Sequence, residues 1–305
     1  MFSYYINKIL QKFNIIIIFR NGNAIGEIVY LTSLINFLYS ENSKYKIIIL
    51  TKFPEIFFYN KKIYFNFKIY KNIFYKFVFF ILFRTLGKNI VDFNAETKQL
   101  DNDTSFLKNY PNNTHLALVV RKFKLNFQSN FIKNEIFFSN KEKEIFEKKL
   151  LLPGEYAVTH SQAKLTYAKN KDWGYKNIQN VINLTPKIKW VQVGLSFEPL
   201  LENSIQKFNV SLRELAYIIF RSKFVLTLEG LYNHLASCFD KKTFIILSGI
   251  LPVAASYYKN NVVISKFENL DCAPCYKLNS CVQSEKLCTT QITPEYVVDM
   301  INKNS

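Results

Sequence analysis

Residues 229–236 read EGLYNHLA and combine an acid, a glycine and one of the three histidines of the chain. They follow the apolar run FVLTL at 224–228, which predicts a buried strand, so the stretch should open a helix. Helix N-termini favour phosphate because their first backbone N–H groups have no partner within the helix. Gly230 and His234 can therefore contact a phosphate, whereas Glu229 suits sugar or nucleoside hydroxyls. The alternative is a capped, half-buried histidine without a ligand.

A comparable stretch, GNAIGE at 22–27, follows the apolar run at 14–19. Its glycines let backbone N–H groups face an anion, so we expect Asn23 and Gly26 to lie on the phosphate or acceptor side. Glu27 falls in the first helical turn, where position alone indicates an acid that complements the helix dipole, worth under about 1 kcal/mol. Because the spacing is not G-x-G-x-x-G, a dinucleotide site is only weakly indicated.

Two further polar stretches follow predicted strands in the second half of the chain. Residues 160–173, HSQAKLTYAKNKDW, are basic, and a lysine such as Lys171 can meet a diphosphate as a point charge. A solvated loop is an equal alternative for this stretch. In GLSFE at 194–198, Gly194 permits a close turn. Glu198 can accept hydrogen bonds from ribose hydroxyls, as acids after a Rossmann strand often do.

Four of the five cysteines fall between residues 272 and 288, with the spacing C-x2-C-x5-C-x6-C. No small-residue cleavage site follows the apolar stretches of residues 1–20, so secretion and disulfides are not indicated. Four thiolates suit structural zinc or an iron centre, but the spacing is not that of a standard zinc ribbon. Free thiols therefore remain an equal alternative. The candidate ligands are Cys272, Cys275, Cys281 and Cys288.

The charge of the chain is +17, and it is unevenly distributed. Residues 1–90 hold 13 Lys and Arg against 3 Glu, a net of +10, whereas residues 251–305 net zero. This asymmetry indicates an anionic partner such as lipid headgroups, a phosphorylated glycan or nucleic acid. A general enrichment in Lys, Asn, Ile, Phe and Tyr would explain it equally well. The sequence carries no recognised nucleic-acid motif, so we expect no nucleic-acid partner.

The apolar stretch 77–83, FVFFILF, is too short for a membrane-spanning helix, which needs about 20 residues. It is better explained as a core element, and an interfacial face with basic flanks is the alternative. We therefore expect a cytoplasmic protein, with a peripheral contact to the inner face of the inner membrane as a further expectation.

The pattern of the elements predicts two α/β domains. A strand at 14–19, a helix at 27–40 and a strand at 46–51 form a βαβ unit with a parallel sheet. Weaker patterns predict strands at 90–93 and 115–120. A charged surface helix at 139–150 should end the first domain.

The second half repeats this alternation of strands and helices. Strands are predicted at 156–160, 188–194, 224–228 and 243–248, with helices between them. Ser211 and Glu214 form a capping box that opens one of these helices. We expect an N-terminal Rossmann-like domain at 1–152 and a second at 153–305, the latter with the cysteine segment 272–288 and a closing helix at 294–302.

In this order, these pieces resemble the family 9 glycosyltransferases, the bacterial heptosyltransferase family. The resemblance covers most of the chain. No single motif is specific to the family, but the order in which the motifs occur is. The motifs are 25-IGE-27, 171-KDW-173, Gly194 with Glu198, 211-SLREL-215, 229-EGLYNHLA-236 and the C-x2-C…C…C segment. The chain departs from the family at Glu27 and Glu229, where Asp is usual, and at Leu231, where Gly is usual.

The resemblance implies a GT-B fold, with two Rossmann-like domains that face each other across a cleft. It implies inverting transfer without a catalytic metal, with Glu27 as the base and the acceptor bound by the first domain. The second domain would bind the nucleoside-diphosphate sugar, ADP-heptose being the first guess. The expected donor-binding residues are Lys171, Gly194, Glu198, Glu229, Gly230 and His234.

The expected acceptor is an anionic glycan or glycolipid, such as lipopolysaccharide core or a related surface glycan. Two alternatives remain open on the sequence. One is an enzyme of the same fold that modifies a protein, with the cysteine segment serving in docking. The other is a non-catalytic module with a degenerate GT-B fold or a general basic binding surface.

Overall fold

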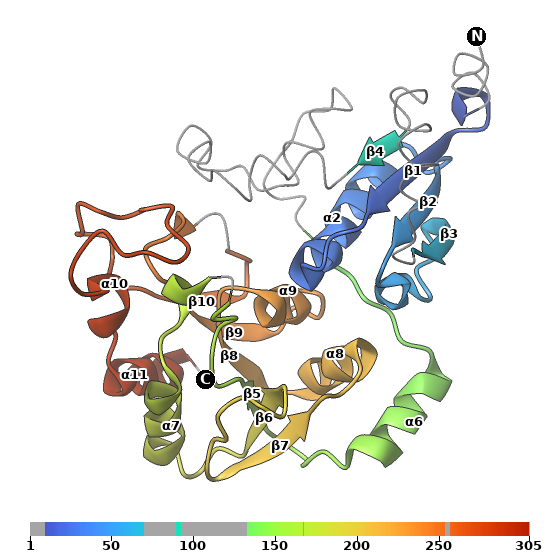
Figure 1. The fold of residues 1–305 in the computed structure, drawn as a ribbon. Coiled ribbons are helices and arrows are strands. Elements are labelled where there is room, and N and C mark those ends of the chain that lie inside the picture. The colour runs from blue at the N-terminus through green and yellow to red at the C-terminus, as the bar shows by residue number, and fades with distance from the viewer. Residues whose placement is uncertain (1–9, 70–89, 93–132, 167, 254–256, 305) are drawn as a thin grey trace. The chain divides into compact units, whose positions relative to one another are not determined.

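The structure of the protein is a computed structural model, shown in Figure 1. It describes residues 10–69, 90–92, 133–166, 168–253 and 257–304. The chain divides into two compact units, and in the described part the division falls between Ser139 and Asn140. The predicted strand at 115–120 and the apolar stretch at 77–83 lie outside the described residues.

The first unit contains a four-stranded parallel sheet in the order β3-β2-β1-β4. β1 and β2 pair from Ile15 opposite Lys46 to Arg20 opposite Thr51. Their isoleucine runs form strands because β-branched side chains fit a pleated, buried surface. The elements of the unit are β1 (Ile15–Arg20), α2 (Ile25–Glu41), β2 (Lys46–Thr51), the 3-10 helix η1 (Pro54–Phe57), β3 (Ile63–Lys68) and β4 (Ile90–Asp92).

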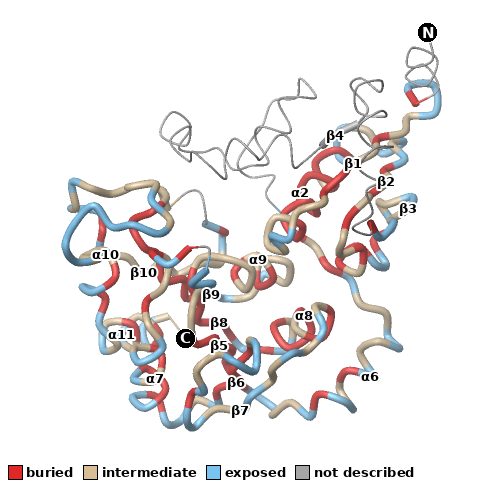
Figure 2. The backbone as a smooth tube through the Cα atoms, viewed as in Figure 1, coloured by how far each residue is buried: buried red, intermediate tan, exposed pale blue. Residues whose placement is uncertain are grey.

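Helix α2 connects β1 to β2 and begins at Ile25, two residues before the predicted start. One apolar face was predicted, but residues 28–35, 37 and 38 are all buried, and Figure 2 shows the helix red over most of its length. Two polar side chains inside it are hydrogen-bonded to a later segment of the unit. The Ser33 hydroxyl donates to Asn134 Oδ1 at 2.6 Å, and Thr32 Oγ1 accepts from the Glu135 N–H at 2.9 Å. Such bonds make the burial of these hydroxyls tolerable.

The second unit contains a six-stranded parallel sheet in the order β10-β9-β8-β5-β6-β7. Counted along this unit, the order is 3-2-1-4-5-6, which is the strand order of a dinucleotide-binding Rossmann sheet. The strands are β5 (Ala157–Thr159), β6 (Trp190–Gly194), β7 (Ser204–Phe208), β8 (Phe224–Leu228), β9 (Lys242–Ile246) and β10 (Asn261–Ile264). The helices are α6 (Asn140–Leu150), the 3-10 helix η4 (Lys169–Lys171), α7 (Tyr175–Leu184), α8 (Leu212–Arg221), α9 (Leu231–Ser237), α10 (Leu287–Thr290) and α11 (Pro294–Asn304).

Aromatic side chains join the central strands of this sheet to its core. The rings of Trp190 and Phe224 meet edge to face with centroids 5.6 Å apart, and those of Phe224 and Phe244 lie 5.2 Å apart. The predicted capping box of α8 is present, because the Ser211 hydroxyl accepts from the Glu214 N–H while the Ser211 N–H donates to Glu214 Oε2. The edge strands β7 and β10 were not predicted. β7, SIQKF, has no apolar run, and β10 is only four residues long.

The predicted boundary at residue 152 needs correction, because α6 belongs to the second unit. Glu142 on α6 receives two hydrogen bonds from the Arg213 guanidinium on α8, at 2.9 and 2.7 Å. The ring of Phe146 packs against Tyr217 at a centroid distance of 5.3 Å. The helix predicted to be a charged surface helix is thus anchored to α8 through Glu142 and Phe146. No helix within the described residues is long and apolar enough to cross a membrane.

Candidate functional site

The second sheet reverses its strand order between β5 and β8, and the candidate residues of this unit follow the ends of β5, β6 and β8 in the chain. β5 leads directly into His160 and Ser161, and β8 leads directly into Glu229. In open α/β sheets, the crevice outside the carboxyl ends at such a reversal is where ligands bind. The topology therefore assigns the predicted donor residues to one place, although they come from separate stretches of the chain.

Lys171 and Glu229, which are 58 residues apart in the chain, form an ion pair. The Lys171 ammonium lies 2.9 Å from Glu229 Oε1, and the two side chains are 17% and 13% exposed. η4, which carries Lys171, is fixed by Asn170, whose backbone N–H donates to the Leu278 carbonyl at 2.9 Å. Each charge is mostly shielded from water and compensates the other. An incoming phosphate can exchange with the carboxylate as the partner of the lysine.

His234 lies on α9, close enough to Lys171 and Glu229 for both charges to affect it. Burial lowers the pKa of His234 to about 4, and the neighbouring charges of Glu229 and Lys171 act in opposite directions. The imidazole is therefore neutral at pH 7. Its Nδ1 is 2.6 Å from the Tyr258 hydroxyl, and the two rings meet edge to face. Because α9 has only seven residues, we assign anion contacts to side chains rather than to its N-terminus.

Gly194 and Glu198 lie at the end of β6, as predicted, and approach each other closely. Gly194 has a φ of +150°, and a Cβ at this position would lie 2.5 Å from Glu198 Oε2. Burial raises the pKa of the Glu198 carboxyl, and the nearby Leu195 backbone and Ser161 side chain offset this in part. Glu198 Oε2 and Ser161 Oγ are both buried, and neither makes a hydrogen bond of normal geometry within the described residues. Buried polar atoms of this kind are usually satisfied by an ordered water or by a ligand.

Sequence reasoning missed three aromatic or imidazole side chains of this site. His160 stacks on Tyr232 with ring centroids 4.4 Å apart, and burial lowers the pKa of His160 to about 4. Burial also raises the pKa of Tyr232, with a smaller contribution from the charge of Glu198. The place of His160 directly after a strand was a usable signal. Tyr258, just before β10, offered none, since that strand was itself not predicted.

In the first unit, Glu27 forms an ion pair with Arg20, which ends β1. Both side chains are largely buried. Gly22 leaves the space that the arginine fills, because a Cβ there would lie 2.5–3.0 Å from the guanidinium atoms. Asn23 accepts a hydrogen bond from Lys52 at 2.8 Å, and Gly26 lies in the first turn of α2. Arg20 was not predicted, although its place at the strand end was a signal.

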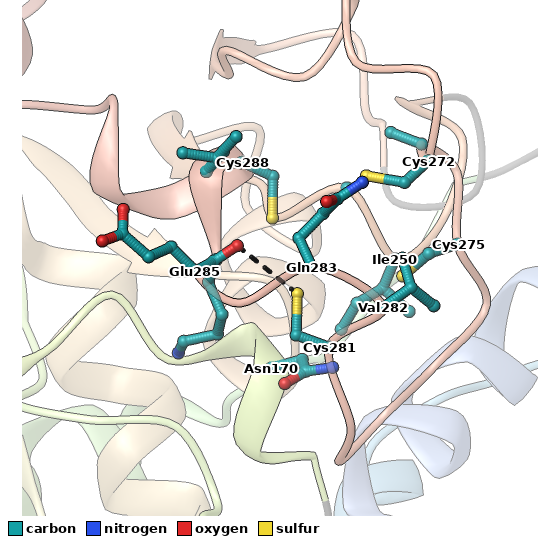
Figure 3. A pocket seen from close by; sticks show the side chains of 13 residues that line it. Asn170, Ile250, Cys272, Cys275, Cys281, Val282, Gln283, Glu285 and Cys288 are labelled. Atoms are coloured by element: carbon teal, nitrogen blue, oxygen red, sulfur yellow. Dashed lines mark hydrogen bonds between the residues drawn. The ribbon is translucent and has the colours of Figure 1, made fainter.

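The four cysteines of the 272–288 segment line one small cavity of about 20 Å³. Figure 3 shows the sulfurs of Cys281 and Cys288 directed toward it, with Cys281 Sγ 3.6 Å from the Glu285 carbonyl. Burial raises the pKa of the Cys288 thiol, and the three other thiols raise it further. Cysteine thiols suit a soft metal ion. Their arrangement in the structure does not form a metal site, because no three His, Cys, Asp or Glu side chains within the described residues are placed to bind a metal ion together.

Comparison with known proteins yields no matching family model and no matching curated protein. Solved structures do match. A family 9 glycosyl transferase from Veillonella parvula has a TM-score of 0.66 at 11% identity, over 95% of this chain and 97% of that chain. The E. coli heptosyltransferase WaaC with ADP has a TM-score of 0.61 at 14% identity, over 95% and 100%.

A third match is TibC from enterotoxigenic E. coli, described as an iron-containing dodecameric glycosyltransferase. It has a TM-score of 0.61 at 12% identity, over 95% of this chain and 75% of that chain. The chain has the GT-B fold. At these identities the matches establish the fold, and it agrees with the two parallel Rossmann-like sheets described above.

Proposed function

We propose that the chain is an inverting family 9 glycosyltransferase. It would move a sugar from a nucleoside-diphosphate sugar to a hydroxyl of lipopolysaccharide core or a related surface glycan. One observation carries the proposal. Lys171, Glu229 and His234, each predicted from the sequence, come together where the second sheet reverses its strand order. A cation, an acid and a neutral hydrogen-bonding ring suit a diphosphate joined to a polyhydroxylated group.

The donor proposed first is ADP-heptose. The support is that structures with matching folds contain ADP, in WaaC, or ADP-heptose, in TibC. In this chain, Glu198 and Ser161 offer buried oxygens with unused hydrogen-bonding capacity, which suits the ribose hydroxyls. Glu229 suits hydroxyls of the nucleoside or the sugar. Lys171 and His234 suit the phosphate oxygens.

The proposed chemistry is a direct displacement at the anomeric carbon. Glu27 accepts the proton of an acceptor hydroxyl while that oxygen attacks, and the bond from the anomeric carbon to the diphosphate breaks. Such a base contributes about 10²–10⁴-fold to the rate. Arg20 orients the Glu27 carboxylate through their ion pair. The negative charge that develops on the leaving diphosphate would be stabilised by Lys171 and by a hydrogen bond from His234.

A panel of nucleoside-diphosphate sugars, scored by released nucleotide in the presence of lipopolysaccharide core, tests this function. We expect release with ADP-heptose, and release slowed by about 10²–10⁴-fold in the Glu27→Gln variant. Transfer only to a protein acceptor would favour the protein-modifying alternative. If calorimetric titration shows no binding of any nucleoside-diphosphate sugar, the chain is a non-catalytic module and the proposal is wrong.

An anionic, membrane-anchored acceptor is the proposed reason for the charge asymmetry. Residues 1–90 net +10, so this part of the chain would face phosphorylated glycolipid at the inner face of the inner membrane. Co-sedimentation with anionic and with neutral vesicles at two salt concentrations tests this. We expect binding to anionic vesicles only, weaker at the higher salt concentration.

We further propose that the four cysteines of the 272–288 segment bind one structural zinc or iron ion, with no part in catalysis. Their shared cavity and soft sulfur ligands support this, and the segment would have to rearrange to bring the thiols together. Metal analysis of the purified protein provides the test. Cys281→Ser and Cys288→Ser should lose the metal, whereas Cys238→Ser, outside the segment, should keep it. Equal metal content in all variants would favour free thiols.

A further inference from the structure

Tyr258 and His234 form a hydrogen-bonded pair that the proposed chemistry has not yet used. The Tyr258 hydroxyl lies 2.6 Å from His234 Nδ1, and Tyr258 is 8% exposed. His234 is intermediate in exposure. Nδ1 of the imidazole is thus engaged by the protein.

Two backbone and side-chain contacts hold this pair in place. The Asn261 N–H donates to the Tyr258 carbonyl at 2.9 Å, which fixes the tyrosine in the turn before β10. Asn261 Nδ2 donates to Asn233 Oδ1 at 3.0 Å, and Asn233, next to His234 on α9, is fully buried. The turn before β10 and helix α9 are therefore joined at two adjacent points, so the distance between Tyr258 and His234 is well constrained.

The direction of the hydrogen bond follows from the chemistry of the two groups. A neutral imidazole has one protonated and one unprotonated nitrogen, and the unprotonated one is a good acceptor. A phenol is a good donor, but its oxygen is a poorer acceptor because one lone pair is delocalised into the ring. The favoured arrangement is therefore O–H···Nδ1. The proton of His234 is then on Nε2.

We propose that Tyr258 is a positioning residue, which fixes His234 as the Nε2–H tautomer so that its ring donates a hydrogen bond to a phosphate oxygen of the donor nucleotide. The second half of this statement rests on the proposed function. The first half concerns the free protein alone. A neutral hydrogen-bond donor suits this site, because Lys171 already supplies the positive charge that a diphosphate needs.

His160 provides an internal reference with the opposite tautomer. Its Nε2 accepts from the Leu228 N–H at 3.2 Å, and its Nδ1 lies 2.9 Å from the Gln162 carbonyl. A backbone N–H can only donate and a carbonyl can only accept, so His160 carries its proton on Nδ1. Only three histidines occur in the chain, and the third, His115, lies outside the described residues.

The test is long-range ¹H–¹⁵N spectroscopy of the histidine rings in the nucleotide-free protein, with His234→Gln used to assign the signals. We expect the Nδ1–H pattern for His160 and the Nε2–H pattern for His234. In Tyr258→Phe, which keeps the ring and its packing, His234 should become a mixture of tautomers while His160 stays unchanged. An unchanged His160 signal also shows that the variant is folded. Tyr257→Phe, at an exposed neighbouring position, is the matched control and should alter neither signal.

Calorimetric titration with ADP tests the second half. We expect Tyr258→Phe and His234→Gln each to weaken ADP binding by about tenfold, and the double variant by no more than His234→Gln alone. The proposal is overturned if His234 shows the Nδ1–H pattern, if Tyr258→Phe leaves its Nε2–H pattern intact, or if the two substitutions weaken ADP binding additively. If the unaltered protein binds no ADP, the proposed function fails, and the spectra still decide whether Tyr258 fixes the tautomer.

Discussion

Each of the two units places an acidic residue shortly after a parallel strand and pairs it with a positively charged side chain. The two ion pairs are built differently. In the first unit, Glu27 pairs with Arg20, seven residues earlier at the end of β1. In the second, Glu229 pairs with Lys171 from the 3-10 helix η4, 58 residues away. Arginine is a planar donor that holds a carboxylate in a fixed orientation, whereas lysine is a mobile point charge. The comparison suggests a permanent pair that orients a base and an exchangeable pair that opens for a ligand.

The largest expected effect is on the rate of sugar transfer, and it tests whether Glu27, unlike Glu229, acts in catalysis without contributing to nucleotide binding. Glu27→Gln keeps the size of the side chain but removes the base, so the rate of sugar transfer should fall by about 10²–10⁴-fold. ADP binding, measured by calorimetry, should stay within about twofold of the unaltered protein, since the proposed nucleotide contacts lie in the second unit. Undiminished turnover would remove Glu27 from its proposed role.

The next effect concerns the exchangeable pair. Lys171→Met removes the cation and should weaken ADP binding by about ten- to a hundredfold, because a hydrogen bond to a charged group is worth about 1.5–3 kcal/mol. The salt dependence of binding should also decrease. Lys169→Met, in the same short helix, is the matched control. Equal losses in both variants would indicate general electrostatic attraction instead of a specific contact.

A smaller effect concerns the turn that carries Glu198. Gly194→Ala forces a side chain onto a φ of +150° and into Glu198 Oε2, so the free energy of unfolding should fall by about 1–3 kcal/mol. Gly154→Ala meets nothing within 4 Å and serves as the control, with an expected change near zero. Denaturant unfolding measures both. If the Gly194→Ala variant is as stable as the unaltered protein, the close approach of Gly194 to Glu198 is not required for stability.

The smallest effect is a dependence of stability on pH. The pKa of buried His160 is lowered to about 4, against a usual value of 6.5, so the unfolded chain binds a proton that the folded chain does not. The contribution of His160 to the free energy of unfolding should therefore be fully present above about pH 6.5 and be lost as the pH falls toward 4. Comparing urea unfolding at pH 7 and pH 5.5 for the protein and for His160→Gln isolates this contribution. Equal pH dependence in both would contradict it.

Much of the fold follows from local patterns. The isoleucine run at 14–19, the apolar run at 224–228 and the capping box of Ser211 with Glu214 all lie where predicted. The weakest predictions involved elements whose own sequences carry little signal. β7 is polar because it is an edge strand, and α6 has the charged composition of a solvated helix although it packs on α8.

The candidate site was predicted in part. The residues Lys171, Glu198, Glu229 and His234 were identified by their places after strands, and the structure brings Lys171, Glu229 and His234 together. Tyr258 was missed because its contribution depends on the strand order around β10, which no short stretch reveals. Arg20 was missed because a buried arginine at a strand end is recognisable only once its partner is known.

The sequence by itself determined the alternation of strands and helices, the capping of α8 and the positions of the acids at strand ends. These depend on periodicity and on contacts within a few residues, which any short segment contains. The tertiary structure alone decided the strand order, the unit to which α6 belongs and the pairing of Lys171 with Glu229 and of Tyr258 with His234. Those contacts join residues far apart in the chain, and they exist only when the whole sheet is assembled.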